Sequence, residues 1–340
     1  MKAENMEFVT LPGLDKPVSR ICYGTWAIGG WMWGHSSDAD EGFKTILQAY
    51  DMGINFLDTA PCYGLGASEQ LVGRAIREIG RENVVLATKF GLQWDEKGDI
   101  TRNCTAQRMR KEIEDSLLRL NVDYVDLYNV HWPDPLVPFE ETAALMEDLK
   151  KEGKIRAIGV SNFDPAQMKQ FAKGGTINSS QIQYNIFERG IEDDVLPYQR
   201  ENHIFTVLYS TLCRGMLGGR MKVDTKFSGD DMRLRDPKWQ MPRYAQYVSA
   251  VDQIDAYAKQ HFGHSVNQLS TRWVLDQPGC DVVIWGAKNR QQLEAIPGML
   301  GWKMTAEDIA AVNKIVDDTV TDPATPEYLL PPDRNGNTHC

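Results

Sequence analysis

An alternation of short apolar segments with amphipathic helical segments constrains this chain more than any other feature. Eight apolar segments predict strands, and they lie at residues 20–23, 56–60, 84–89, 125–131, 155–161, 180–184, 205–210 and 282–286. Most are apolar on both faces, which is typical of parallel strands that are buried on both sides. Eight strands with crossover helices fit either a doubly wound sheet or a (β/α)8 barrel.

The helical segments between these strands carry recognisable start and stop signals. Thr105 and Asp164 stand where an N-cap is expected, and Pro165 follows as the first helical residue. Gly153 follows the helix expected over 141–152, as a residue just past a helix end should.

Two segments do not fit the simple alternation. Residues 213–243 form a long stretch rich in Gly, Asp, Pro and Arg after the seventh strand, and such a stretch favours a lid or binding loop. Helices expected at about 244–261 and 265–277 then precede the eighth strand, and a proline-rich tail, 318–340, is expected to lie over the surface. Because no linker divides the chain, we expect a single domain over 1–340.

Composition narrows the classes of partner. The 340 residues include 37 basic and 47 acidic side chains, a formal net charge of −10, which argues against nucleic-acid binding and a basic membrane anchor. The uncharged segment 21–37 is too short and too rich in glycine to span a membrane. The N-terminal residues have no apolar run after the first lysine, so the sequence does not predict a secretory signal. The six cysteines show no metal-binding spacing, so we expect reduced thiols, no metal and a cytoplasmic location.

Polar or chemically useful residues stand at the ends of most of the expected strands. They are Asp58, Lys89, His131, Ser161–Asn162, Gln183, Tyr209–Ser210 and Gly286–Lys288. In a barrel all of these ends open on one face, where barrel active sites are built. Any one of them fits an ordinary polar strand terminus, but the series together indicates a functional site.

Asp58, Tyr63, Lys89 and His131 form a chemically coherent set. A tyrosine normally titrates near 10, and an ionised lysine held by an aspartate would lower the pKa of that phenol. A nearby histidine can orient a carbonyl oxygen or share the proton. Such a set would protonate a developing alkoxide, which suits carbonyl reduction by hydride. Taken singly, Lys89 and Asp58 also fit a structural ion pair, and His131 fits a hydrogen-bonded histidine at a strand end.

Several motifs along the chain resemble those of the aldo-keto reductase family. They are FLDTA at 56–60, Tyr63-Gly64 with Ser68-Glu69 and Gly73, ATK at 87–89, HWPD at 131–134, GVSNF at 159–163, QIQYN at 181–185, YSTLCRGMLGGR at 209–220 and WGAKNRQQLE at 285–294. The resemblance runs from about residue 8 to 316, and is greatest to a bacterial branch that includes general stress protein 69 and the inositol-operon reductase.

The resemblance implies a (β/α)8 barrel that binds NADP(H) without a Rossmann fold. It implies that Tyr63 is the general acid, that Lys89 and Asp58 tune it, and that His131 orients the substrate. In agreement, the glycines of this chain lack the G-x-G-x-x-G spacing and context of a dinucleotide-binding turn.

The resemblance also implies a set of cofactor-binding residues. Besides Asp58 they are Gly24, Thr25 and Trp26 under the nicotinamide ring, Ser161, Asn162 and Gln183 at its carboxamide, Tyr209 stacked on it, the pyrophosphate belt Ser210, Thr211, Leu212, Cys213, Arg214 and Gly215, and the last loop Gly286, Ala287, Lys288, Arg290 and Gln292. Lys288 and Arg290 can supply the cationic donors that a 2′-phosphate needs, so we expect NADPH, with NADH possible.

The sequence thus predicts a cytoplasmic NADPH-dependent reductase of a small aldehyde or ketone, most simply a monomer. Two alternatives stay open: a sugar or polyol dehydrogenase that works mainly in the oxidative direction, and a cofactor-binding regulatory barrel that acts through a partner. The carbonyl substrate is left open, because the loops 29–37, 91–101 and 213–243 and the tail carry the least pattern.

Overall fold

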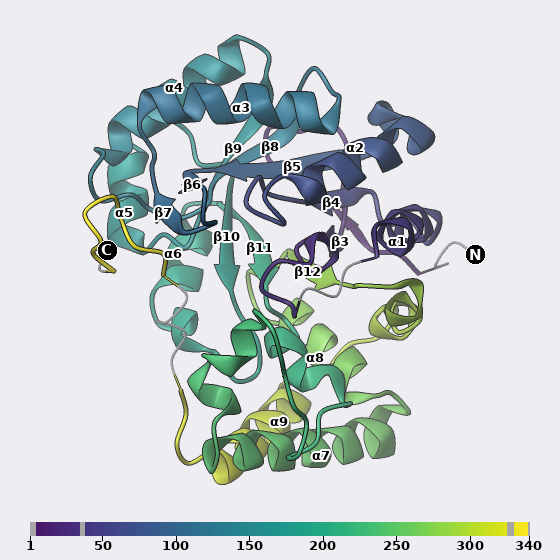
Figure 1. Cartoon of the computed structure of the whole chain (residues 1–340). Coiled ribbons are helices and arrows are strands. Elements are labelled where there is room, and N and C mark those ends of the chain that lie inside the picture. The colour runs from purple at the N-terminus through teal and green to yellow at the C-terminus, as the bar shows by residue number, and fades with distance from the viewer. Residues whose placement is uncertain (1–4, 35–37, 325–329, 339–340) are drawn as a thin grey trace.

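The computed structural model describes residues 5–34, 38–324 and 330–338, and within them eight parallel strands close into a barrel ringed by helices (Figure 1). The strands are β3 (Ile21–Gly24), β4 (Phe56–Asp58), β5 (Val85–Phe90), β8 (Val125–Val130), β9 (Ile155–Ser161), β10 (Ser179–Gln183), β11 (Phe205–Tyr209) and β12 (Val282–Gly286). All eight coincide with the strands expected from the sequence. Because β12 pairs with β3, the sheet is closed, and the (β/α)8 barrel is confirmed over the doubly wound sheet.

Helices cover the outside of the barrel. They are α1 (Ala39–Asp51), α2 (Ala67–Ile79), α3 (Ala106–Leu120), α4 (Phe139–Lys151), α5 (Pro165–Phe171), α6 (Val195–Glu201), α7 (Arg243–Phe262), α8 (Val266–Leu275) and α9 (Ala306–Thr319). Asp164 caps α5 in a reciprocal capping box, with Pro165 in the first turn. Gly153, with φ +79°, follows the end of α4. Thr105 stands at the N-cap of α3, but its hydroxyl donates to Asn103 Oδ1 instead of capping the helix.

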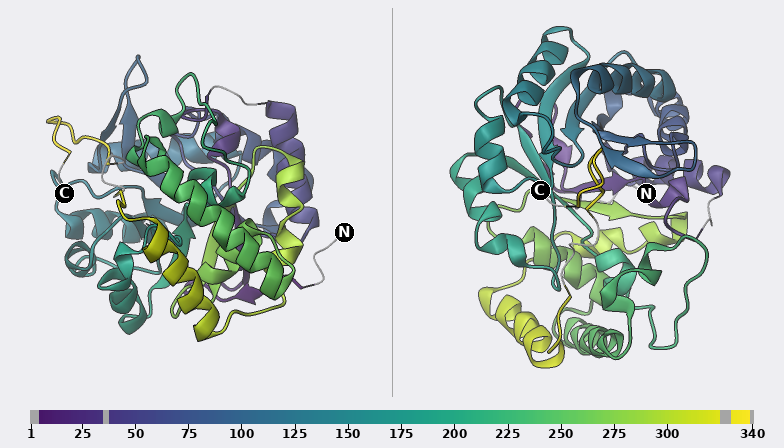
Figure 2. Two further views of the ribbon diagram at one scale, coloured as in Figure 1. Left: turned by 90° about the horizontal axis from the view of Figure 1, so that it is seen from below. Right: turned by 60° about the vertical axis from the view of Figure 1, so that its left-hand side comes forward.

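Several elements lie outside the eight strand–helix units, at the carboxyl-terminal mouth of the barrel and along one of its sides. The long segment after β11 forms short 3-10 turns, at Cys213–Gly218, Met232–Leu234 and Pro237–Trp239, before α7. Helices α7 and α9 pack side by side at one edge of the barrel (Figures 1 and 2). A hairpin of β6 (Leu92–Trp94) and β7 (Ile100–Arg102) occupies the segment that the sequence left as an unpatterned loop.

The last described part of the tail, residues 330–338, lies against this hairpin (Figure 2). The N–H of Arg102 donates to the carbonyl of Pro332 (2.8 Å), and Arg334 pairs with the buried Asp134 at 2.6 Å. Residues 35–37 of the first loop, and 325–329 and 339–340 of the tail, including Cys340, lie outside the described residues.

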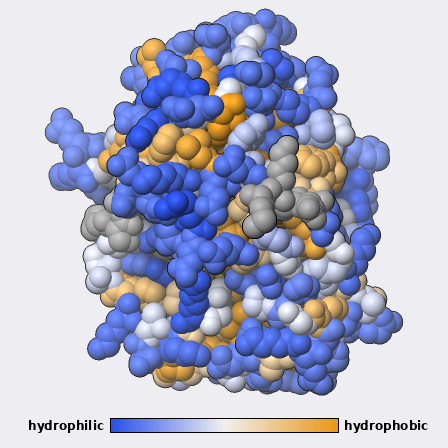
Figure 3. Space-filling model, turned by 90° about the vertical axis from the view of Figure 1, so that its right-hand side faces the viewer, coloured by the Kyte–Doolittle hydropathy of each residue, from blue (hydrophilic) through white to orange (hydrophobic). Residues whose placement is uncertain are grey.

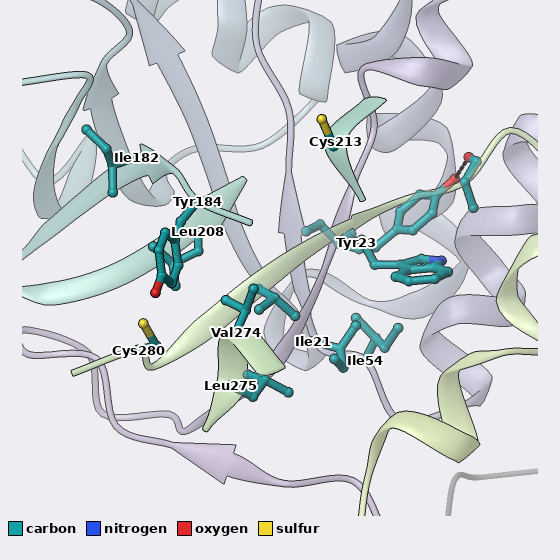
Figure 4. Close-up of a cluster of buried hydrophobic side chains, with 14 of the residues drawn as sticks. Ile21, Tyr23, Ile54, Ile182, Tyr184, Leu208, Cys213, Val274, Leu275 and Cys280 are labelled. Carbon is teal, nitrogen blue, oxygen red and sulfur yellow. Dashed lines mark hydrogen bonds between the residues drawn. The ribbon is translucent and has the colours of Figure 1, made fainter. Parts of the chain in front are cut away.

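Strand alternation divides the core into an inner and an outer layer. Inward side chains such as Phe56, Val85 and Ala87 fill the barrel, and Leu11 and Leu14 of the segment between β1 (Phe8–Val9) and β2 (Val18–Ser19) join the same cluster. Outward side chains such as Ile21 and Tyr23 of β3 belong to an outer cluster with helix residues such as Val274 of α8, part of which Figure 4 shows. Burial on both faces explains the nearly continuous apolar strands of the sequence.

On the face shown in Figure 3 hydrophilic residues predominate and hydrophobic ones form separate patches. Within the described ranges, no helix is long and apolar enough to cross a membrane.

Close packing of α2 on α3 depends on Gly73. A methyl group at this position would lie 2.5 Å from the carbonyl oxygen of Leu120 and 2.8 Å from that of Arg119, both on the backbone. Because these atoms cannot rotate away, any side chain would force the two helices apart.

We therefore expect Gly73→Ala to lower the free energy of unfolding by about 1–3 kcal/mol, the range typical of overpacked cores. Urea denaturation followed by circular dichroism measures this change. Gly190→Ala is the control, because nothing lies within 4 Å of its added methyl, and it should be neutral or slightly stabilising. Equal stability of Gly73→Ala and the unmodified protein would contradict the packing argument.

Candidate active site

A fully buried lysine forms the centre of the site at the carboxyl-terminal mouth. Lys89 Nζ donates to Asp58 Oδ2 at 2.7 Å, to the carbonyl of Thr59 at 2.9 Å and to Tyr63 Oη at 3.2 Å. An ammonium group has three protons, so every one of them has a partner. The ion pair lets a charge persist at a depth where an unpaired ammonium would be strongly disfavoured.

Local sequence explains why these groups meet. Lys89 lies two residues after Ala87 on β5, and Asp58 lies two residues after Phe56 on β4, so alternation turns both polar side chains into the barrel. Tyr63 sits in the tight turn that follows β4, where its N–H donates to the carbonyl of Ala60 (3.1 Å).

The structure adds one residue to the expected set. Gln181 Nε2 donates to Asp58 Oδ1 at 2.9 Å, so both oxygens of this buried carboxylate are bonded. Gln183, which the resemblance assigned to the nicotinamide carboxamide, lies two residues nearer the mouth on the same face of β10. The amide nitrogen of Gln183 is buried and has no hydrogen-bond partner among the described residues. Both glutamines occur in the QIQYN motif, and only their depth in the barrel distinguishes them.

Burial dominates the acidity of Tyr63. It raises the pKa of the phenol well above its usual value, and the charge of Asp58 acts in the same direction. The expectation of a lowered pKa for Tyr63 is therefore wrong, because the net shift is upward. The Lys89 hydrogen bond does favour the phenolate, but the ammonium is shared with Asp58, and desolvation of the phenolate is the larger effect. Tyr63 is a protonated phenol at neutral pH.

His131 lies beside Tyr63, and the two rings are nearly perpendicular. The two ring centroids are 5.8 Å apart with an interplanar angle of 82°. The backbone N–H of His131 donates to the carbonyl of Phe90, and its backbone carbonyl accepts from the side-chain amide of Asn162. Burial and the charge of Lys89 hold the pKa of His131 well below its usual value, so the imidazole is neutral.

Three residues of the expected nicotinamide set lie together across the mouth. Tyr209 Oη donates to Asn162 Oδ1 at 2.7 Å, and Asn162 Nδ2 lies 3.1 Å from Ser161 Oγ. Asn162 adopts φ +64°, a left-handed conformation that asparagine tolerates better than most residues. These side chains come from the ends of β9 and β11 and reach the backbone of His131.

Aromatic side chains surround Tyr63 on its other side. The Trp26 ring stacks on Tyr63 with centroids 5.9 Å apart, and Trp33 meets Trp26 edge-on at 5.4 Å. Trp94 and Trp132 pack against the same small apolar cluster. This is the arrangement expected of an apolar substrate wall, and it draws on the loop after β3, the β6–β7 hairpin and the end of β8.

The belt after β11 is held by buried ion pairs. Arg214 Nη2 pairs with Glu188 at 2.7 Å and Nε pairs with Asp236 at 2.9 Å, and Lys238 Nζ lies 2.6 Å from Glu188. Although burial alone would raise it, these two cations hold the pKa of Glu188 at about 2. The sequence predicted that the Arg214 side chain meets a phosphate. The geometry instead commits its guanidinium to two carboxylates that fix the shape of the belt.

The cations expected at the adenosine end also have protein partners. Lys288 Nζ donates to the carbonyl of Trp33 at 2.9 Å, and the Lys288 N–H donates to Gln292 Oε1 at 2.7 Å. Arg290 pairs with Glu41 of α1, through its backbone N–H at 3.0 Å and its guanidinium at 3.1 Å. Both residues border the loop that follows β3.

Within the described ranges, no group of three or more histidine, cysteine, aspartate or glutamate side chains could hold a metal ion. Five cysteines that the structure describes are buried free thiols.

The fold is a (β/α)8 barrel, and the buried Lys89–Asp58 pair lies at the carboxyl ends of its strands, where the active sites of barrel enzymes are built. The chain belongs to the aldo/keto reductase family, whose sequence model matches residues 20–317. It is therefore a member of an oxidoreductase family acting on CH–OH or C=O groups, and the family resemblance inferred from the motifs is confirmed.

Similar proteins place the chain in the bacterial part of this family. It is 49% identical over 330 residues to aldo-keto reductase YhdN of Bacillus subtilis (strain 168), covering 97% of this chain and 99% of that protein. It is 32% identical over 325 residues to the NADH-specific methylglyoxal reductase of Escherichia coli (strain K12), covering 92% and 99%. The solved structure of glycerol dehydrogenase AKR11B4 from Gluconobacter oxydans superimposes with a TM-score of 0.85 at 44% identity, covering 96% and 99%.

A double-mutant cycle tests the buried pair. Lys89→Met should lower the free energy of unfolding by about 3 kcal/mol, because it leaves the Asp58 carboxylate buried and uncompensated. Adding Asp58→Asn should recover part of this loss, since the second change removes the unpaired charge. Denaturant unfolding of the four proteins measures both terms. Lys151→Met, which removes an exposed ion pair with Asp148, is the control and should change little. Strict additivity of the two buried changes would contradict the pairing.

Proposed function

We propose that this protein is a cytoplasmic NADPH-dependent reductase that converts an aldehyde or ketone to an alcohol, with Tyr63 as proton donor. The observation that carries the proposal is the contact of the buried Lys89–Asp58 pair with Tyr63 Oη at the barrel mouth. An ion pair with only a structural role would not need a phenol as the acceptor for the third ammonium proton of Lys89. Nor would it need a neutral histidine and aromatic side chains beside that phenol.

In the proposed reaction Tyr63 gives its proton to the oxygen of the reduced carbonyl. The high pKa of the phenol keeps the proton in place until negative charge develops on that oxygen. Lys89 then stabilises the phenolate through its 3.2 Å contact. Asp58 holds the ammonium group in place, and Gln181 in turn fixes the carboxylate of Asp58. The neutral His131 can donate one hydrogen bond to the same oxygen.

The residues around the mouth fit a nicotinamide cofactor, which would supply the hydride when bound. The nicotinamide carboxamide needs a donor and acceptors, and the buried amide of Gln183 has a donor without a partner among the described residues. Ser161, Asn162 and Tyr209 are linked by hydrogen bonds at the same mouth. Tyr209 also offers an aromatic face on which a nicotinamide ring could stack. Gly24 ends β3, and Thr25 and Trp26 follow it at the same mouth, where we assign them to the nicotinamide ring.

The belt residues suit a pyrophosphate through their backbone. Ser210, Cys213, Arg214 and Gly215 have φ of 58°, 45°, 54° and 91°, while Leu212 between them has φ −96°. The N–H groups of Cys213 and Gly215 donate within the belt, to the carbonyls of Ser210 and Leu212. A tight turn that mixes the two signs of φ can gather its remaining N–H groups into a concave nest, which binds anions. We assign Thr211 and Leu212 to this contact through their main chain, and Arg214 to holding its shape.

Charges at the adenosine end favour NADPH while leaving room for NADH. Burial and the nearby Arg233 lower the pKa of Lys288, so a 2′-phosphate beside Lys288 would offset both effects. Arg290 forms an ion pair with Glu41, so a phosphate must compete with that carboxylate for the guanidinium. The loop that presents these cations begins after Gly286, the last residue of β12. It is held by Ala287, whose carbonyl accepts from Tyr23 Oη, and by Gln292, which accepts from Trp285 Nε1 and from the N–H of Lys288.

Alcohol oxidation is the second candidate function. It is favoured by the similarity to the Gluconobacter glycerol dehydrogenase over nearly the whole chain. The same groups serve both directions, because a phenolate held by Lys89 accepts the alcohol proton that the phenol would otherwise give. A regulatory barrel receives less support, since it does not require the complete set of Asp58, Tyr63, Lys89 and His131.

Tyr63→Phe tests the proton donor. It removes the only group proposed to supply the proton, so kcat for carbonyl reduction should fall by about 10²–10⁴-fold with NADPH affinity nearly unchanged. NADPH consumption with a panel of aldehydes, diketones and sugars measures the first quantity, and cofactor fluorescence titration the second. Tyr128→Phe, which removes a buried hydroxyl on the outer side of the barrel wall, is the matched control. Retained turnover in Tyr63→Phe would reject the assignment.

Lys288 and Glu41 test the cofactor proposal. Lys288→Met should lower kcat/KM for NADPH about tenfold and leave that for NADH nearly unchanged, because a charge-assisted contact to phosphate is lost. Glu41→Gln should raise the preference for NADPH about threefold, because a carboxylate no longer faces the phosphate. Steady-state kinetics with both cofactors measure these ratios. Parallel losses for NADPH and NADH in Lys288→Met would place the 2′-phosphate elsewhere.

A further inference from the structure

Cys62 contacts the ring of His131. Its sulfur lies 3.7 Å from Nδ1 of the imidazole, within hydrogen-bonding distance for sulfur. Cys62 directly precedes Tyr63 and is 2% exposed, inside the small apolar cluster that also holds the phenol. None of the motifs or roles described above uses this thiol.

The chemistry of the two groups decides which of them donates. Burial raises the pKa of the Cys62 thiol, so it keeps its proton, and burial together with Lys89 keeps His131 neutral. A neutral imidazole carries one N–H and one unprotonated nitrogen, and the latter is a strong acceptor. A thiol is a weak donor and a weak acceptor, so S–H to nitrogen uses the better acceptor of the two possible arrangements.

We propose that Cys62 is a positioning residue that fixes the tautomer of His131. Its S–H donates to Nδ1, and the single ring proton is therefore held on Nε2. That nitrogen is then the one able to donate to the oxygen of an aldehyde or ketone lying against Tyr63. The use of Nε2–H in catalysis rests on the proposed function, whereas the tautomer itself does not.

Geometry supports this assignment in a second way. The main chain of His131 is fixed at both its N–H and its carbonyl, by Phe90 and by the amide of Asn162. The backbone therefore cannot shift to give Nδ1 another neighbour, and ring rotation is limited by the edge-on contact with Tyr63. Cys62 and Tyr63 are adjacent in sequence, so one turn places both the proton donor and the group that orients its neighbour.

Nitrogen NMR of protein labelled with 15N-histidine tests the tautomer directly. The chain has 6 histidines, and His131→Gln identifies the signals of the one that matters. We expect the unmodified protein to show a protonated Nε2 and an unprotonated Nδ1, and Cys62→Ala to show a mixture of tautomers. A protonated Nδ1 in the unmodified protein would overturn the proposal. This readout needs no turnover, so it separates failure of the proposal from failure of the proposed function.

Kinetics test the consequence for catalysis. Cys62→Ala should lower kcat about fivefold, the loss typical of one net hydrogen bond, with KM for NADPH unchanged. Cys62→Ser keeps a donor at this position and should restore both the single tautomer and most of kcat. Cys280→Ala removes a buried thiol that precedes β12, at the opposite end of the barrel, and controls for the loss of volume. Equal ring-nitrogen signals in Cys62→Ala, Cys62→Ser and the unmodified protein would show that the thiol only fills space.

Discussion

The pairing of β12 with β3 is the constraint on which the rest of the structure depends. It joins Ile21 and Val283, which are 262 positions apart in the sequence, and turns an open parallel sheet into a barrel. Closure fixes which side chains are enclosed, because alternate residues on every strand must then point inside. It also brings all eight carboxyl ends to one mouth, so residues as distant as Asp58, His131 and Tyr209 become neighbours.

Enclosure makes electrostatics the second organising force. A buried ammonium is tolerated only with a partner, and Lys89 accordingly has Asp58, whose second oxygen is held by Gln181. The belt repeats this solution on a larger scale, with Arg214 and Lys238 balanced by Glu188 and Asp236. Each cluster is formally neutral, so charge can be placed at depth while the geometry around it stays rigid.

The net charge of −10 does not describe the charges near the expected cofactor site. The cations nearest the expected adenosine end contact carboxylates or carbonyls of the protein, as Arg290 does with Glu41 and Lys288 with Trp33. An incoming phosphate would replace such contacts instead of meeting bare charge. Cofactor choice is therefore a balance between competing anions, which a count of lysine and arginine does not reveal.

The sequence by itself determined the eight strands and the polar residues at their ends, because apolar strand segments and strand-end polarity are local patterns that need no knowledge of contacts. Those patterns fitted a doubly wound sheet as well as a barrel, and the family resemblance favoured the barrel that the closed sheet confirms. Only the tertiary structure decided which group each side chain meets: Gln181 on Asp58, carboxylates on Arg214, a thiol on His131, and burial as the main influence on the pKa of Tyr63. Depth, desolvation and pairing depend on distances between segments far apart in the chain, and no local pattern encodes them.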